Sequence, residues 1–271
     1  MLKITKKLIK TVVNISKDAG KAIMDIYKEN DTSFEYKLDK TPVTNADLKS
    51  HNIIKQGLDL LAVNIPILSE EDANVNFEER SKWLEYWLID PLDGTKEFLN
   101  RNGEFTVNIA LMRNNKPIFG VIYSPVTDET FWGAEGYGSY QITEIAGENK
   151  IMVSDKNKKR IACSRSHQKS SAIEEFADQY SYKIIRIGSS YKFCMLAKGN
   201  VDVYPRIGPT SEWDIAAGHA ILKYSGGVII DFSGKKIVYN KKNLLNPNFI
   251  AASNKLLANN TKEILTNEKR K

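Results

Sequence analysis

Two aspartates flank a proline in the stretch WLIDPLDGTKEFLN, which covers residues 87–100. Asp90 and Asp93 lie three positions apart, and Gly94 and Thr95 follow directly. The pattern Asp-Pro-x-Asp-Gly is typical of a turn, because proline fixes φ, glycine accepts positive φ and aspartate bonds its own backbone. The same carboxylates could instead hold a divalent cation against a phosphate group. Taken alone, a motif of this length is compatible with both interpretations.

The residues next to this stretch favour a ligand site. Asp90 ends the short apolar run YWLID (86–90), which predicts a buried strand stopped by Pro91. Asp90 is therefore expected at the carboxyl end of a strand, where α/β folds bind ligands. Residues 95–99 can begin a helix, and the N–H groups of its first turn would form an anion site. Carboxylates would repel a phosphate there unless a divalent cation lay between the two groups.

More carboxylates occur where predicted elements end or begin. Glu70, Glu71 and Asp72 end a predicted strand, IPILSEED, and Asp214 opens a predicted helix, WDIAAGHAILKY. Taken one at a time, an acidic run is usually solvated, and an aspartate at a helix start is usually a cap. Their coincidence with the DPLDGT stretch favours a metal site instead. Oxygen ligands without histidine or cysteine favour Mg²⁺ or Mn²⁺ over zinc.

The elements that would position these side chains follow from hydrophobic periodicity. Apolar residues recur at helical spacing over 2–27 and from 45 or 46 to 63, which predicts two amphipathic helices. The stretch 106–140 alternates apolar and polar residues around RNNKP, which predicts an antiparallel sheet. Strands and helices alternate after it, with strands expected near 161–167, 183–190 and 228–234 and helices near 170–179, 191–199 and 213–226.

This order of elements predicts a mixed α/β fold of α+β layers. Two tightly joined halves are expected, 1–150 with most of the metal ligands and 151–271 completing the substrate site. A doubly wound nucleotide fold is not expected, because the glycine-rich dinucleotide fingerprint and the P-loop are both absent from the sequence.

Composition limits the classes of function. The chain has 271 residues, of which 42% are hydrophobic and 27% charged, as in soluble globular proteins. No apolar run reaches the roughly 20 residues that span a bilayer, and the N-terminus lacks the apolar core of a signal peptide. The two cysteines, Cys163 and Cys194, form no zinc-binding or disulfide pattern. A cytoplasmic location is the expectation.

The net charge of +6 allows two interpretations. It suits an anionic partner such as a phosphorylated metabolite, a nucleic acid or a membrane surface. It equally suits solvated faces, because the lysines are scattered along the chain. The basic helix expected over 2–27 is typical of the first helix of a domain, and it also suits peripheral contact with the cytoplasmic face of the inner membrane. The oligomeric state is not readable.

Three blocks carry a resemblance to a known family. The segments LSEE (68–71), WLIDPLDGTKEF (87–98) and EWDIAAGHAIL (212–222) resemble the signature blocks of the lithium-sensitive, magnesium-dependent phosphatases of the inositol monophosphatase superfamily, in the same order. The resemblance implies the layered αβαβα sandwich of the lithium-sensitive sugar phosphatases. It also implies two or three Mg²⁺ ions as cofactors, with Mn²⁺ an alternative.

The resemblance also implies roles for named residues. A first metal would be held by Glu70, Asp90 and the Leu92 carbonyl, and a second by Asp90, Asp93 and Asp214. Thr95, paired with Asp47 of TPVTNADLKSH, would orient and activate a metal-bound water. The substrate would be surrounded by residues of the same blocks, namely Glu70, Leu92, Asp93, Gly94, Thr95 and Asp214.

Other segments resemble one branch of the family, the 3'(2'),5'-bisphosphate nucleotidases of the CysQ type. These segments are TPVTNAD, GTKEF, SRSH and GSSYKFCMLAKGNVDVYPR. The resemblance implies that His167, Ser189, Lys192 and Arg206 lie near a second phosphate and the nucleoside, where cations beyond the metals are needed. Three of them also have an ordinary structural interpretation: His167 as a surface histidine, Lys192 as a solvated lysine and Arg206 as an ion-paired arginine.

The implied function is a Mg²⁺-dependent phosphatase that removes the 3'-phosphate of adenosine 3',5'-bisphosphate (PAP), a by-product of sulfate activation, to give AMP. PAPS would be a second substrate, and the partner is a small phosphorylated molecule. An inositol or other sugar monophosphatase is the alternative within the class. A non-catalytic basic protein that binds RNA or membranes is the alternative outside it, although no RNA-binding motif with stacking aromatics occurs.

Overall fold

The computed structural model describes residues 1–29, 34–36, 42–61, 64–166 and 171–268. Within these residues the helices are α1 (Lys6–Lys28), α2 (Asn45–Asp59), α3 (Phe77–Arg80), α4 (Thr95–Leu99), α5 (Ser171–Gln179), α6 (Tyr191–Ala197), α7 (Glu212–Tyr224) and α8 (Lys255–Glu268). The strands are β1 (Phe34–Tyr36), β2 (Pro42–Thr44), β3 (Ile67–Ser69), β4 (Glu85–Asp93), β5 (Thr106–Arg113), β6 (Lys116–Ser124), β7 (Glu129–Ala134), β8 (Gly138–Thr143), β9 (Gly147–Ile151), β10 (Arg160–Ser164), β11 (Lys183–Ile187), β12 (Val203–Arg206), β13 (Val228–Asp231) and β14 (Phe249–Ala252).

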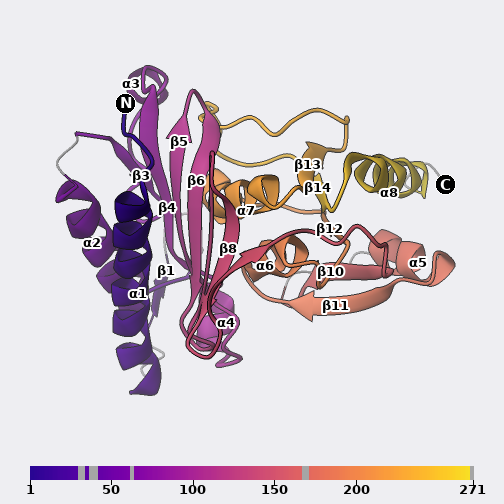
Figure 1. The fold of residues 1–271 in the computed structure, drawn as a ribbon, viewed down its shortest axis with the longest axis horizontal. Coiled ribbons are helices and arrows are strands. Elements are labelled where there is room, and N and C mark those ends of the chain that lie inside the picture. Colours follow the sequence, from indigo (N-terminus) through magenta and orange to yellow (C-terminus); the bar gives the residue numbers. More distant parts are fainter. Residues whose placement is uncertain (30–33, 37–41, 62–63, 167–170, 269–271) are drawn as a thin grey trace.

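Helices and sheets alternate in five layers (Figure 1). Helices α1 and α2 cover one face of a seven-stranded sheet, β3 to β9 in chain order. Helices α6 and α7 pack between this sheet and a five-stranded one ordered β11-β10-β12-β14-β13. Helices α5 and α8 cover the outer face of the second sheet. The αβαβα expectation is therefore confirmed.

The expected helices form with shifted ends. The first begins at Lys6 rather than residue 2, because Thr5 is its N-cap and accepts a hydrogen bond from the N–H of Leu8 at 3.1 Å. The second begins at Asn45, as expected, and ends at Asp59. The last expected residue of that helix, 63, lies outside the described residues.

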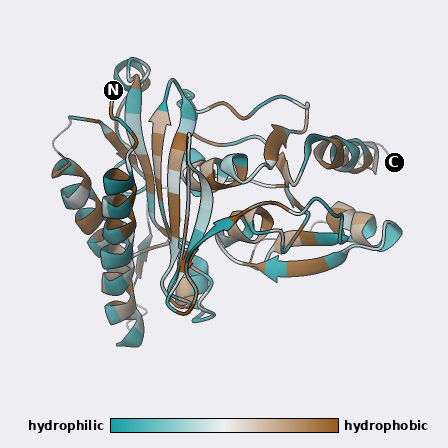
Figure 2. Cartoon of the chain, in the orientation of Figure 1, coloured by the Kyte–Doolittle hydropathy of each residue, from teal (hydrophilic) through white to brown (hydrophobic). Residues whose placement is uncertain are grey.

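Helix α1 buries its apolar face on the large sheet. Its residues Leu8, Val12 and Ile23 are buried in a cluster that also contains Trp87 and Phe119 of the sheet. In Figure 2, apolar residues are concentrated in the strands of the sheets, and polar residues lie on the sides of the helices that face away from the sheets. This is the arrangement expected for the first helix of a domain. No helix among the described residues has the length and apolar character needed to cross a membrane.

The central helix α7 lies close to the large sheet because small residues face it. A Cβ added at Gly120 of β6 would come within 2.6 Å of the Ala217 carbonyl oxygen, so a side chain there would push the helix away. One hydrophobic cluster joins Leu88 and Phe131 of the large sheet to Phe193 and Phe249 of the second half. The two halves therefore share a core, and the boundary at residues 150 and 151 stays a prediction.

Strand β4 carries the irregularity on which the site depends. The strand was expected to stop at Pro91, but it continues to Asp93, so this prediction is wrong. Asp90 pairs with Asn108 and Asp93 pairs with Thr106, which leaves Pro91 and the following residue opposite a single residue of β5. Such a bulge tolerates proline, because the extra residue makes no ladder hydrogen bond.

The bulge also decides where the two aspartates point. Successive strand residues alternate between faces, so residues three apart normally point to opposite sides of a sheet. Asp90 and Asp93 pair instead with Asn108 and Thr106, which are two apart and share a face. The extra residue therefore turns both carboxylates toward the same side of the sheet.

Candidate active site

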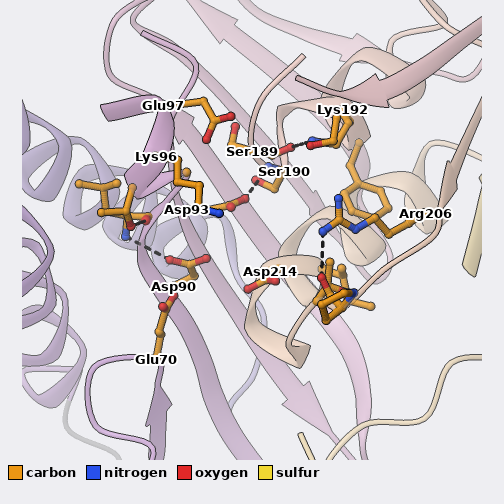
Figure 3. A pocket seen from close by; sticks show the side chains of 18 of the residues that line it. Glu70, Asp90, Asp93, Lys96, Glu97, Ser189, Ser190, Lys192, Arg206 and Asp214 are labelled. Carbon is orange, nitrogen blue, oxygen red and sulfur yellow. Dashed lines mark hydrogen bonds between the residues drawn. The ribbon is translucent and has the colours of Figure 1, made fainter. Parts of the chain in front are cut away.

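Three carboxylates from separate elements meet in a pocket lined by both halves of the chain (Figure 3). Glu70 follows β3, Asp90 lies in β4 and Asp214 lies in the first turn of α7. Strands β3 and β4 run parallel with Ser69 opposite Ile89, so Glu70 and Asp90 leave the same edge of the sheet together. One ligand oxygen from each carboxylate lies within 4.8 Å of the others, and Asp90 is only 1% exposed.

The close carboxylates interact unfavourably with one another. Burial, with the charges of Glu70, Asp93 and Asp214, raises the pKa of Asp90 well above its ordinary value. Burial, with the charges of Asp93 and Glu70, likewise raises the pKa of Asp214 well above its ordinary value, although Arg206 opposes the shift. A divalent cation among these oxygens would reverse both effects. The all-oxygen donor set and its mutual repulsion therefore fit a hard divalent cation.

Asp93 lies beside this group and is fixed by hydrogen bonds from two other elements. The N–H of Ser190 and the Nδ2 of Asn108 donate to Asp93 Oδ2 at 2.5 and 3.3 Å. The hydroxyls of Ser190 and Thr106 in turn donate to Asn108 Oδ1 at 2.7 and 3.2 Å. Burial raises the pKa of Asp93, while Lys192 and these donors lower it. These three supporting residues were not predicted from the sequence.

Thr95 and Asp47 form a second polar pair at the wall of the pocket. The Thr95 hydroxyl donates to Asp47 Oδ1 at 3.2 Å. Asp47 is buried in the first turn of α2, and its Oδ2 accepts the N–H and the hydroxyl of Thr44 at 2.8 and 2.6 Å. Ser50, one turn further on, donates its hydroxyl to the Pro91 carbonyl at 2.7 Å. One face of α2 therefore holds both the pair and the bulged strand in place.

The opposite end of the pocket is basic. Lys192 of α6 is 4% exposed, and its ammonium donates to the carbonyls of Ile187 and Ser189 at 3.2 and 2.5 Å. Burial lowers the pKa of Lys192 to about 8, and the nearby Asp93 opposes the shift. Arg206 at the end of β12 is 5% exposed and donates to the Pro209 carbonyl at 2.8 Å. Both cations face a pocket that also contains the acidic group (Figure 3).

The structure brings most of the expected site residues into one pocket. The expected residues that line it are Glu70, Asp90, Leu92, Asp93, Gly94, Thr95, Ser189, Lys192, Arg206 and Asp214. Asp47 lies behind Thr95, and His167 lies outside the described residues. Glu70 shares its close group with Asp90 and Asp214, whereas the resemblance places Glu70 and Asp214 on different cations. The roles of these residues stay predictions.

The helix that carries Asp214 also contains a partly buried histidine. His219 Nδ1 lies 2.9 Å from the Tyr239 hydroxyl, and burial lowers the pKa of His219 to about 4. The folded protein therefore keeps this ring neutral, whereas the unfolded chain protonates it near pH 6.5. The resulting stability is complete above pH 6.5 and is lost as the pH falls toward 4.

We therefore expect the free energy of unfolding to fall by about 1–2 kcal/mol between pH 7.5 and pH 5 because of His219 alone. Urea unfolding of the wild type and of His219→Gln at both pH values measures the contribution of His219 to the free energy of unfolding, since the two proteins share all other titrating groups. A pH dependence equally steep in the two proteins would contradict the assignment.

Comparison with known proteins places the chain in a family. A model of the inositol monophosphatase family matches residues 5–268. The chain belongs to this family. The 3'(2'),5'-bisphosphate nucleotidase CysQ of Salmonella typhimurium is 43% identical over 245 residues, which cover 89% of this chain and 98% of that protein. CysQ of Haemophilus influenzae, with the same full name, is 35% identical and is covered to 94%.

Solved structures are similar to this chain over most of its length. CysQ from Bacteroides thetaiotaomicron, described as a bacterial member of this family, superimposes with a TM-score of 0.80 at 37% identity, over 91% of this chain and 97% of that chain. The extragenic suppressor protein suhB from Bartonella henselae superimposes with a TM-score of 0.78 at 25% identity, over 96% of this chain and 98% of that chain. The resemblance drawn from the three sequence blocks is confirmed.

Proposed function

We propose that this protein is a Mg²⁺-dependent phosphatase that hydrolyses the 3'-phosphate of adenosine 3',5'-bisphosphate to AMP and phosphate. The division of charge in one pocket carries the proposal. Glu70, Asp90 and Asp214 gather at one end, and Lys192 and Arg206 lie at the other. A substrate with two separate phosphates matches this division, because one phosphate would meet the cations bound by the acids and the other the basic side chains. Identity to the CysQ nucleotidases over most of the chain supports the substrate.

The carboxylates would hold the metal ions. Glu70, Asp90 and the Leu92 carbonyl suit one Mg²⁺, and Asp90, Asp93 and Asp214 suit a second. When bound, such cations neutralise phosphate charge and lower the pKa of a water molecule. A third ion and Mn²⁺ are compatible with the same oxygen ligands.

The chain's own residues would position the nucleophile and the substrate. Thr95 can accept a proton from the attacking water as its own proton passes to Asp47 Oδ1, along the hydrogen bond of 3.2 Å. Lys192 and Arg206 would hold the phosphate that is not cleaved, and Lys192 is kept in place by two carbonyl oxygens. Phosphoryl transfer needs mainly such positioning and charge neutralisation. PAPS, which carries the same 3'-phosphate, would be a further substrate in sulfur metabolism.

A substrate series tests this function directly. We expect kcat/KM for adenosine 3',5'-bisphosphate to exceed that for adenosine 3'-monophosphate by about 10- to 100-fold, because a charge-assisted contact to the second phosphate is then lost. In Arg206→Gln the advantage should shrink, while hydrolysis of the monophosphate stays close to the wild-type rate. Phosphate release with Mg²⁺ and with EDTA tests the metal requirement, since EDTA should abolish it.

The same series decides between the proposed function and its alternatives. A higher kcat/KM for inositol 1-phosphate would assign the protein to the inositol monophosphatases. Phosphate release that survives EDTA would rule out the metal mechanism. If no phosphate were released from any ester, the alternative of a non-catalytic binding protein would be favoured.

A further inference from the structure

One buried carboxylate of the pocket, that of Glu97, takes no part in the proposed reaction. Glu97 lies in the first turn of α4, is 3% exposed and lines the pocket. No described residue donates a hydrogen bond to its carboxylate or forms an ion pair with it. The Glu97 oxygens are accessible from the pocket rather than sealed in the core, so their hydrogen-bond donors come from water or from a bound ligand.

The surroundings show that Glu97 is held in place rather than left loose. A Cβ added at Gly188 would lie 2.6 Å from Glu97 Cγ, so the side chain packs directly against that glycine. The carboxylate also lies over Gly94, where an added Cβ would be 3.3 Å from Glu97 Oε2. In a capping box, an acid at this helix position accepts a hydrogen bond from the backbone N–H of the N-cap residue, but no capping box forms at Gly94.

The neighbouring acid shows the contrast. Glu104 accepts two hydrogen bonds from Arg165, each of 2.6 Å, and a third from the N–H of Gly188 at 2.7 Å. That carboxylate is satisfied by the chain and ties the loops of the two halves together. Glu97, which packs against the same Gly188, faces the pocket instead.

Glu97 lies close enough to both acidic and basic side chains of the pocket to act on them. The charge of Glu97 acts on the pKa of Asp93 at the acidic end and on that of Lys192 at the basic end. Figure 3 shows Glu97 near Ser189, beyond Asp93 as seen from Asp90. A phosphate would be repelled by a carboxylate at this place, whereas a hydroxyl would donate to it.

We propose that Glu97 accepts a hydrogen bond from the free ribose hydroxyl of the substrate and so selects ribonucleotides. The inference rests on the proposed function. In adenosine 3',5'-bisphosphate the sugar lies between the two phosphates, and its 2'-hydroxyl is the free donor of the ring. Glu97 lines the same pocket as Asp93 and Lys192, which would lie near the cleaved and the retained phosphate. Glu97 is thus a specificity residue that completes its own hydrogen bonding only with the substrate bound.

The test compares adenosine 3',5'-bisphosphate with its 2'-deoxy analogue. A hydrogen bond to a charged acceptor should give the wild type a kcat/KM about 10- to 100-fold higher for the ribose substrate. Glu97→Met keeps the length of the side chain without an acceptor, so its ratio should fall to about 1. Glu97→Gln keeps a neutral acceptor, and its ratio should lie between the two. Lys96→Gln, on the same helix, should alter both substrates equally and leave the ratio unchanged.

The outcomes separate this inference from the function on which it rests. Hydrolysis of both bisphosphates with the same ratio in the wild type and Glu97→Met would overturn the role of Glu97 and leave the proposed function standing. If Glu97→Met lost equal activity on both substrates and needed a different Mg²⁺ concentration, Glu97 would be assigned to binding a cation. That result would also overturn its role as a specificity residue. Hydrolysis of neither bisphosphate by the wild type would overturn both proposals.

Discussion

Replacing Asp90 by asparagine should abolish turnover and, without metal, raise the melting temperature. Asp90 is fully buried among Glu70, Asp93 and Asp214, and burial with these charges raises its pKa well above the ordinary value. The asparagine side chain would resemble the protonated acid, keep an oxygen for the Leu92 N–H that now lies 3.1 Å from Asp90 Oδ1, and remove the repulsion. We expect kcat to fall by about 10³-fold, since a metal supplies several kcal/mol of transition-state stabilisation.

The stability effect has the opposite sign and is measured separately. Relief of a buried, uncompensated charge should stabilise the EDTA-treated protein by about 1–3 kcal/mol, or about 3–8 °C in Tm. Mg²⁺ should raise the Tm of the wild type and have a smaller effect on the variant, because binding to the native state alone stabilises it. Calorimetry with and without Mg²⁺ gives both values.

A control variant tests whether removing any carboxylate, rather than one of the acidic group, raises the melting temperature. Asp231→Asn changes a carboxylate that serves an exposed turn, where it accepts from the N–H of Ser233 at 2.8 Å. Asp231→Asn should not show the rise in Tm that is expected for Asp90→Asn in EDTA. A lower Tm for Asp90→Asn than for the wild type in EDTA would mean that Asp90 is stabilised by the chain itself, which would contradict the repulsion argument.

The sequence predicted those features that depend on the type and spacing of nearby residues. The helix after Gly94 was predicted from a local pattern and the layered architecture from the family resemblance, and both are confirmed. The expected acidic residues lie in one pocket, while their roles stay predictions. The strand end at Pro91 was predicted wrongly, because proline usually stops a strand and a bulge depends on the partner strand. The pairing of Asp90 with Asn108 and of Asp93 with Thr106 is a property of the sheet, which no local pattern of residues 87–100 contains.

The supports of Asp93 were missed for a similar reason. Thr106 and Asn108 are polar residues at the start of a strand whose next four residues are apolar, and alternate positions share a face, so the pattern contained a signal. Their partner Ser190 comes from a segment 82 residues further along the chain, and that contact follows only from the fold. Strands β12 and β14, of four residues each, were likewise not predicted. Helix α8 was not predicted either.

Two of the expected site residues also cap helices. Asp47 and Asp214 each occupy the third position of a helix and accept the N–H of the N-cap residue, Thr44 or Ser211. A carboxylate has more acceptor sites than a cap uses, so the remaining oxygen is available elsewhere. In Asp47 it meets Thr95, and Asp214 contributes a ligand oxygen to the acidic group. In both residues, the hydrogen bond at the helix start fixes the orientation of the carboxylate.

Removing the Thr95 hydroxyl should lower kcat by about 10²- to 10⁴-fold, the usual contribution of positioned proton transfer. Thr95→Val keeps the shape of the side chain and loses the donor to Asp47, while Thr95→Ser keeps the donor and should retain most activity. The KM for adenosine 3',5'-bisphosphate should change little, since the contacts of its second phosphate lie at the other end of the pocket. Steady-state kinetics of the three proteins at saturating Mg²⁺ measure this.

The coupling of Thr95 with Asp47 is tested by combining variants. Asp47→Asn should cost similar activity and, because Asp47 also caps α2 through Thr44, about 1 kcal/mol of stability. If proton transfer runs through both groups, the double variant Thr95→Val with Asp47→Asn should be no slower than the worse single variant, because residues that act as a unit are not additive. Losses that multiply would show two independent contributions and contradict the relay. Thr95→Val with near wild-type kcat would remove Thr95 from the reaction altogether, leaving its hydrogen bond to Asp47 as a structural contact between α2 and α4.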